Sequence, residues 1–170
     1  MMTANAVAEV LAMLDKASVQ VWLDGGWGVD ALLGEQTRDH NDLDIILSSK
    51  DVPSLQEALI SIGFKTKIAG TAANFILADE HGREIDVHPI EFDQRGYGVF
   101  KLSDGRRWPF PPAAFAGVGR VGECRVRCLS ADAQVTCHAQ GYAPRERDLR
   151  DMERLQERFG VVLPLSLCRQ

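Results

Sequence analysis

The sequence predicts an α+β fold in which a mixed sheet with flanking helices is followed by a C-terminal helical segment. Apolar residues recur at helical spacing near the N-terminus, fall into short runs that suit strands, and return to helical spacing after residue 129. At 170 residues, with 45% hydrophobic residues, the chain can bury a sizeable core without disulfides. We therefore expect a core over residues 1–128 and a helical segment over residues 129–170 that packs on it.

Helices and strands alternate in the first part of the chain. An apolar stripe predicts an opening helix, and Gly34 and Gly63 suit the ends of two later helices because glycine accepts the left-handed conformation. Pro53 fits the first turn of the second of these. The expected elements are a helix over 4–16, a strand over 19–23, a helix over 27–33, a strand over 43–47 and a helix that starts near Asp51 and stops at Gly63.

Strands fill the middle of the chain, and helices fill its end. The three prolines within residues 109–112 argue against regular structure there, because proline lacks the N–H that strands and helices use. Ser130 suits the cap of a helix that ends at Gln140, and Pro144 suits the start of another that ends near Gly160. The expected strands cover residues 64–68, 74–78, 84–88, 97–102 and 120–129.

Composition narrows the class of protein. The formal net charge is −5 without a dense Lys/Arg stripe, which argues against a nucleic-acid partner and suits a cationic small molecule. No signal peptide and no apolar run of the ~18 residues needed for a membrane span are found, so we expect a cytoplasmic protein with no membrane partner. A zinc site at Cys124, Cys128, Cys137 and His138 is an alternative to buried thiols, but the spacing does not match paired zinc knuckles.

Two carboxylates stand at the start of one expected strand. Asp42 and Asp44 are two residues apart, which places both on the same face of that strand. Their repulsion is relieved by a hard divalent cation such as Mg²⁺, which takes oxygen ligands and leaves positions for water and phosphate. Asp86, on a later strand, supplies a third carboxylate if the two strands lie side by side.

A glycine pair between a strand and a helix precedes these carboxylates. Gly25 and Gly26 allow the backbone to approach a ligand closely, and the amides that open the next helix favour an anion. Arg38 and His40 can add positive charge at the same place. Singly, these features describe a turn, a solvated strand end or a surface histidine. Together they predict phosphoryl or nucleotidyl transfer.

Two further groups have an open role. Asp148 and Asp151 share a face of the last helix, where alternating charge is typical of a solvated, ion-paired surface but is also compatible with a site near the nucleotide. Tyr97, Trp108 and Phe110 are aromatic residues suited to lining an acceptor pocket, although such residues are more often core or loop anchors.

These motifs resemble those of small antibiotic nucleotidyltransferases in the polymerase-beta-like superfamily, and of lincosamide nucleotidyltransferases in particular. Three stretches carry the likeness: Trp-Leu-Asp-Gly-Gly-Trp-Gly-Val-Asp at 22–30, Asp-Val-His-Pro-Ile at 86–90, and residues 128–142. Aminoglycoside 2''-nucleotidyltransferases share the Gly-Gly-Trp and Asp-x-Asp parts. The resemblance spans about residues 5–160 and implies a polymerase-beta-like nucleotidyltransferase core.

The resemblance also implies roles for individual residues. Asp86 would be the general base that accepts the proton of the attacking hydroxyl, or a ligand of a second metal. ATP is the implied donor and Mg²⁺ the implied metal. The other implied roles are magnesium ligation by Asp42 and Asp44, and contact with the triphosphate by Gly25, Gly26, Arg38 and His40.

The function expected on this basis is Mg-dependent transfer of AMP from ATP to a hydroxyl of a small antibiotic, conferring resistance. A lincosamide is expected first and an aminoglycoside second. The alternatives are a non-catalytic nucleotide-binding regulator, one half of a toxin–antitoxin pair, and an enzyme acting on a protein or RNA. The resemblance is also compatible with a homodimer.

Overall fold

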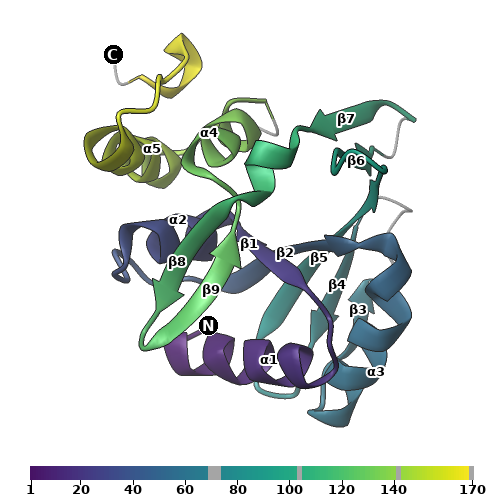
Figure 1. Ribbon diagram of the computed structural model, residues 1–170. Helices are drawn as coiled ribbons and strands as arrows, with labels where there is room; N and C mark the ends of the chain where they lie inside the picture. The colour runs from purple at the N-terminus through teal and green to yellow at the C-terminus, as the bar shows by residue number, and fades with distance from the viewer. Residues whose placement is uncertain (69–73, 103–104, 141–142, 169–170) are drawn as a thin grey trace.

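The computed structural model describes residues 1–68, 74–102, 105–140 and 143–168 (Figure 1). A mixed sheet forms its centre, and helices cover the sheet. The elements are, in chain order, α1 (Ala4–Lys16), β1 (Val21–Asp24), α2 (Gly25–Leu33), β2 (Asp42–Ser48), η1 (Ser49–Asp51), α3 (Val52–Ser61), β3 (Lys65–Ile68), β4 (Phe75–Ala78), β5 (Glu84–Phe92), β6 (Gly98–Lys101), β7 (Arg107–Phe110), η2 (Pro112–Phe115), β8 (Gly117–Val121), β9 (Cys124–Cys128), α4 (Ala131–Gln140), α5 (Glu146–Phe159) and η3 (Leu165–Leu167).

The sheet has a main path and a side branch. The path runs β3-β4-β5-β2-β1-β9-β8, while β6 and β7 form a hairpin that continues from the far half of β5. At its centre β2 lies parallel to β5 and antiparallel to β1. In Figure 1, α1 and α3 lie side by side along the lower part of the sheet, and α4 and α5 stack beyond α2 at the upper left.

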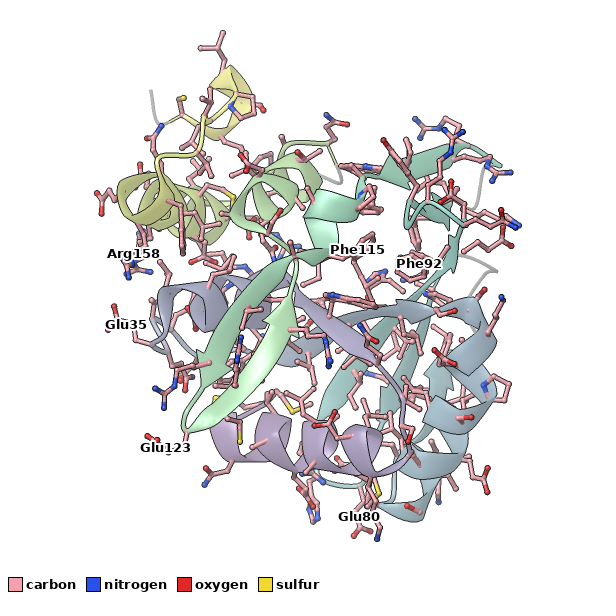
Figure 2. The ribbon with its side chains drawn as sticks, viewed as in Figure 1. Glu35, Glu80, Phe92, Phe115, Glu123 and Arg158 are labelled. Carbon is pink, nitrogen blue, oxygen red and sulfur yellow. The ribbon has the colours of Figure 1, made fainter. Side chains whose placement is uncertain are left out.

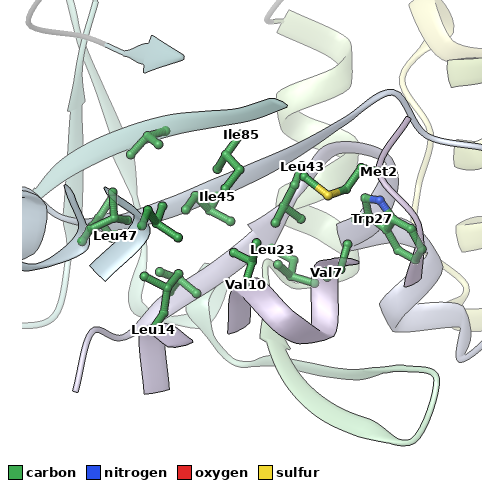
Figure 3. Packing of buried hydrophobic residues seen from close by; sticks show 14 of the residues in the cluster. Met2, Val7, Val10, Leu14, Leu23, Trp27, Leu43, Ile45, Leu47 and Ile85 are labelled. Atoms are coloured by element: carbon green, nitrogen blue, oxygen red, sulfur yellow. The ribbon is translucent and has the colours of Figure 1, made fainter. Parts of the chain in front are cut away.

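The main core lies between the sheet and these helices. Leu43, Ile45 and Leu47 alternate along β2 and point to the same side, where they are fully buried. Figure 3 shows them packed against residues of α1 and against Trp27 of α2. A second apolar cluster, beneath the β6–β7 hairpin, brings Phe92 and Phe115 to 4.9 Å between ring centroids (Figure 2).

The C-terminal segment is packed on α2. Met152 and Leu155 of α5 are fully buried in a cluster with Val29 of α2 and Val135 of α4, and Leu167 closes the cluster. In the part of the chain that the structure describes, no helix combines the length and apolarity that a membrane span requires.

The structure confirms the α+β class and corrects three details. The prolines do not exclude regular structure, because Pro109 lies in β7. Among the described strands β7 pairs with β6 alone, so its outer edge needs no N–H. The single strand expected over 120–129 is instead the β8–β9 hairpin, turning at Gly122 with φ +56°. The last helix begins at Glu146 rather than at Pro144.

Replacing Leu155 with Ala tests whether the C-terminal segment folds with the core. Because Leu155 is fully buried, the substitution should lower the free energy of unfolding by about 2–5 kcal/mol, measured by urea denaturation. Val162→Ala is the control, since Val162 is 84% exposed, and should change it by about 0.5 kcal/mol or less. If the unaltered protein unfolded in two steps, with part of the helical circular-dichroism signal lost before the rest, the C-terminal segment would not fold together with the core.

Candidate active site

Three carboxylates form one row across the centre of the sheet. In the strand register, Asp24 on β1 lies opposite Asp44 on β2, and Asp44 lies opposite Asp86 on β5. Residues opposite one another in register project from the same face, so the three side chains gather at one place. The strands that carry Asp44 and Asp86 do lie side by side, which is the condition under which the sequence places Asp86 with the other carboxylates. Asp24 joins them although sequence reasoning gave it no role.

Two carboxylates of the row and a neighbouring histidine bring together atoms suited to a divalent cation. One ligand atom from each of Asp44, Asp86 and His88 lies within 4.8 Å of the others. His88 Nε2 is 3.8 Å from Asp44 Oδ1 and 3.6 Å from Asp86 Oδ1. Two carboxylates with an imidazole fit a hard or borderline metal ion. Asp42 is outside this group, two positions along β2 and more exposed, although it lines the same cavity.

Electrostatics in the row favour neutralisation of the carboxylates. Burial raises the pKa of Asp24, and the charge of Asp44 raises it further. Desolvation likewise raises the pKa of Asp86 and of Asp42, with Asp44 adding to the shift in each case, although His88 opposes it at Asp86. Like charges crowded in a desolvated place hold protons more tightly unless a cation replaces them. This donor set therefore fits a divalent cation.

Glycines allow α2 to begin against this row. Gly25 has φ +58°, and a Cβ there would collide with Asp44 Oδ2. A Cβ on Gly26 would collide with the His40 ring and come within 2.6 Å of Arg38 NH2. The Gly25 N–H donates to Asp24 Oδ1 at 2.8 Å, so Asp24 caps α2 as well as standing in the carboxylate row.

Arg38 lies beside this glycine turn and is held by the C-terminal helix. Its Nε and NH2 donate to Asp151 Oδ2 at 3.1 and 2.8 Å. Although partial burial opposes the charge, the hydrogen bonds and the charge of Asp151 raise the pKa of Arg38. His40 is buried behind Arg38, with its Nε2 2.5 Å from Asp30 Oδ2.

A cavity of about 490 Å³ brings these residues together with an apolar wall. Trp108 and Phe110 on β7 are stacked at 6.2 Å in this wall, whereas Tyr97 is outside the cavity and 43% exposed, so the expected role of Tyr97 in the pocket is wrong. Two sets of residues complete the lining. The apolar wall consists of Ile46, Ile90, Phe100, Leu102, Trp108 and Phe110, and the last two helices and the turn before α5 contribute Cys137, His138, Arg145, Arg147 and Asp148.

Sequence reasoning did not assign three residues that the structure places here: Asp24, His88 and Asn74. Asn74 donates to Asp86 Oδ1 at 3.2 Å and so orients that carboxylate. The i, i+2 spacing of Asp86 and His88 was available as a signal, because it puts both on one face of β5. Across the described residues the cysteines are unpaired and no cysteine belongs to a metal-type cluster, which gives the zinc alternative no support.

Solved nucleotidyltransferases share this architecture. The structure of ANT(2'')-Ia in complex with adenylyl-2''-tobramycin aligns with 92% of this chain and 89% of its own, at a TM-score of 0.75 and 19% identity. The fold is therefore that of polymerase-beta-like nucleotidyltransferases. Within that class, the chain belongs to the aminoglycoside-2''-adenylyltransferase family, whose sequence model matches residues 6–155.

The chain is similar to proteins named for two different antibiotic classes, lincosamides and aminoglycosides. A lincosamide resistance protein of Staphylococcus haemolyticus is 29% identical over 154 residues, which covers 91% of this chain and 94% of the relative. A 2''-aminoglycoside nucleotidyltransferase of Klebsiella pneumoniae is 26% identical over 127 residues, covering 75% and 67%. The crystal structure of the lincosamide antibiotic adenylyltransferase LnuA with lincomycin bound matches at a TM-score of 0.77 and 28% identity, covering 88% and 94%. These matches confirm the resemblance to small antibiotic nucleotidyltransferases that the sequence motifs indicated.

Asp24→Asn should stabilise the metal-free protein. The raised pKa means that the folded state holds the Asp24 proton more tightly than the unfolded chain, so stability is lost as pH rises through the folded-state pKa. Asparagine removes this loss and keeps a side-chain acceptor for the helix cap. We expect a rise in melting temperature of about 2–4 °C at neutral pH, as for roughly 1 kcal/mol. The difference should close as pH falls towards 3.8, the ordinary value for Asp.

The control for this substitution is Asp132→Asn, because Asp132 is exposed on α4 and should show no such gain. Differential scanning calorimetry with a chelator present measures both variants. A lower melting temperature for Asp24→Asn across the pH range would show that the carboxylate stabilises the fold and would contradict the account of the row.

Proposed function

We propose that this chain transfers AMP from ATP to a hydroxyl of a lincosamide antibiotic, with Mg²⁺ held by the carboxylate row. The observation that carries the proposal is the position of that row within one cavity. On one side of it lie the glycine turn and Arg38, which suit a triphosphate, and on the other lies the apolar wall, which suits an organic acceptor. The activity confers resistance because the modified antibiotic carries a bulky anionic group.

Residues of the row have separate tasks in the mechanism. Asp44 would hold Mg²⁺, with Asp42 at the more exposed end, while Asp86, next to His88, would act as the general base. Bound there, Mg²⁺ supplies positive charge that offsets the charge of the phosphates. Asn74 donates to Asp86 Oδ1 and so orients the carboxylate, whose other oxygen, Oδ2, would accept the proton of the acceptor hydroxyl. The hydroxyl oxygen bonds to the α-phosphorus as the bond to the β-phosphate oxygen breaks, and pyrophosphate leaves.

Binding of the triphosphate would fall to α2 and Arg38. The Gly25 amide is already taken by Asp24, so Gly25 contributes mainly the close approach, while Gly26 and the next amides of α2 face the anion. The guanidinium of Arg38 meets the phosphates beside Gly26. His40 stands behind Arg38 in this arrangement.

The apolar wall favours a lincosamide over an aminoglycoside. A lincosamide joins a sugar with hydroxyls to an alkyl-substituted ring, so it has an apolar part to lay on Trp108 and Phe110. An aminoglycoside is a polycation that needs carboxylates around most of its rings. The carboxylates that line the cavity belong to the row, to Asp42 beside it and to Asp148 of α5, so none of them is part of the apolar wall.

A mass-spectrometric screen tests the acceptor directly. The protein is incubated with ATP and Mg²⁺ together with lincosamides, aminoglycosides, RNA or cell proteins in separate reactions. The proposal expects the lincosamide to gain the mass of one adenylyl group. Modification of an aminoglycoside alone would overturn the choice of acceptor, and modification of a protein or RNA alone would overturn the antibiotic function.

Substitution of the two strand carboxylates should separate binding from chemistry. Asp86→Asn removes the proton acceptor and should lower kcat by about 10²–10⁴-fold, with ATP affinity largely kept. Asp44→Asn removes a metal ligand and should weaken both Mg²⁺-dependent ATP binding and turnover, while circular dichroism shows a normal fold. Steady-state kinetics and calorimetry measure these effects. Turnover by Asp86→Asn equal to that of the unaltered protein would exclude it as the base.

Trp108→Ala should affect the acceptor rather than the nucleotide. Loss of the stacked ring from the cavity wall should raise the KM for the lincosamide by about tenfold and leave the KM for ATP unchanged. Tyr97→Ala is the matched control, since this aromatic side chain lies outside the cavity. An increase in the KM for ATP alone would mean that Trp108 contacts the nucleotide rather than the acceptor, and would contradict this prediction.

A further inference from the structure

The guanidinium of Arg38 is fixed on two sides. Asp151 Oδ2 accepts from its Nε and NH2, and Asp151 itself is 1% exposed. On the other side, NH1 lies 3.0 Å from His40 Nδ1 and donates to the Asp39 carbonyl at 3.2 Å. Of its five N–H groups, one on NH2 has no partner among the residues that the structure describes.

These contacts determine how the proton sits on His40. A guanidinium only donates hydrogen bonds, so His40 Nδ1 must accept from Arg38 NH1. The ring proton is therefore on Nε2, where it donates to Asp30 Oδ2 at 2.5 Å, and Asp30 Oδ1 accepts from the Thr37 hydroxyl at 2.6 Å. Trp27 packs on the ring at 4.7 Å between centroids. The His40 ring is thus held in one orientation against Arg38.

The fixed guanidinium lies against the glycine turn. The near contact between Arg38 NH2 and the position of a Cβ on Gly26 places the remaining N–H beside the start of α2. Asp151 is also approached by Arg154 NH1 at 3.8 Å, so two cations share this carboxylate and the charge of Arg38 is not wholly offset. The arrangement has the form of a preorganised anion contact.

We propose that Asp151 and His40 are positioning residues that hold Arg38 beside Gly26 in the orientation required by the triphosphate. This inference rests on the proposed function and extends it to the C-terminal helix. Through Asp151, α5 becomes part of the nucleotide site as well as of the apolar packing on α2. Arg38 touches the phosphates, whereas Asp151 and His40 act only through Arg38.

Calorimetric titration of Mg²⁺-ATP without acceptor tests the role of Asp151. Asp151→Asn should weaken ATP binding about tenfold, because a neutral amide oxygen holds the guanidinium of Arg38 with weaker hydrogen bonds than the carboxylate does. Asp79→Asn is the matched control. Asp79 is a buried carboxylate that pairs with Arg83 away from the cavity, so its loss should lower the melting temperature and leave ATP affinity unchanged.

A double-mutant cycle distinguishes positioning from a general structural effect. If Asp151 acts through Arg38, then Asp151→Asn should have little further effect on ATP affinity in an Arg38→Gln background. Equal weakening in both backgrounds, or normal ATP affinity of Asp151→Asn, would overturn the proposal while leaving the proposed function intact. Failure of the unaltered protein to bind Mg²⁺-ATP would instead contradict the proposed function on which this inference rests.

The state of His40 is tested on the unaltered protein, so the test does not depend on any variant folding. Nitrogen-15 NMR of the histidine rings should show His40 with a protonated Nε2 and an unprotonated Nδ1 at neutral pH. A protonated Nδ1 would exclude the hydrogen bond from Arg38 and overturn the positioning role of His40.

Discussion

The crowding of three carboxylates in one register row is the constraint on which the rest of the site depends. Asp24, Asp44 and Asp86 face the same way because β1, β2 and β5 are adjacent and in register, and each of Asp24 and Asp86 loses solvation there. Such a row is unfavourable while all three groups are ionised, and binding of a divalent cation would relieve the repulsion. His88 beside Asp86 and the Gly25 N–H that donates to Asp24 each offset part of the repulsion between these carboxylates.

The residues that line the cavity around this row give it a polar half and an apolar half. The polar half is built by the start of α2, and the C-terminal helix reaches it through Asp151. The apolar half is built mainly by the β6–β7 hairpin, with Ile46 of β2 and Ile90 of β5. Because the two halves come from distant parts of the sequence, acceptor contacts can vary in the hairpin without disturbing the phosphate contacts. Relatives that differ in their antibiotic are compatible with such a division.

Sequence reasoning predicted the parts of the site that depend on local spacing. The period of two along a strand placed Asp42 and Asp44 on one face, and the glycine pair indicated a close approach. What could not be predicted depends on long-range pairing. Asp24 enters the row only because β1 pairs with β2, and Asp151 meets Arg38 across 113 positions of sequence. Local propensity also failed at β7, where an edge position accommodates a proline.

The central claim is that the carboxylate row holds a divalent cation together with the nucleotide. Mn²⁺ affinity measured by electron paramagnetic resonance, with and without ATP, tests it most directly, because each ligand must raise the affinity of the other by the same factor if they share a site. The account predicts mutual enhancement in the unaltered protein and its loss when Asp44 is replaced by Asn. Equal ATP affinity with and without a divalent cation would contradict it.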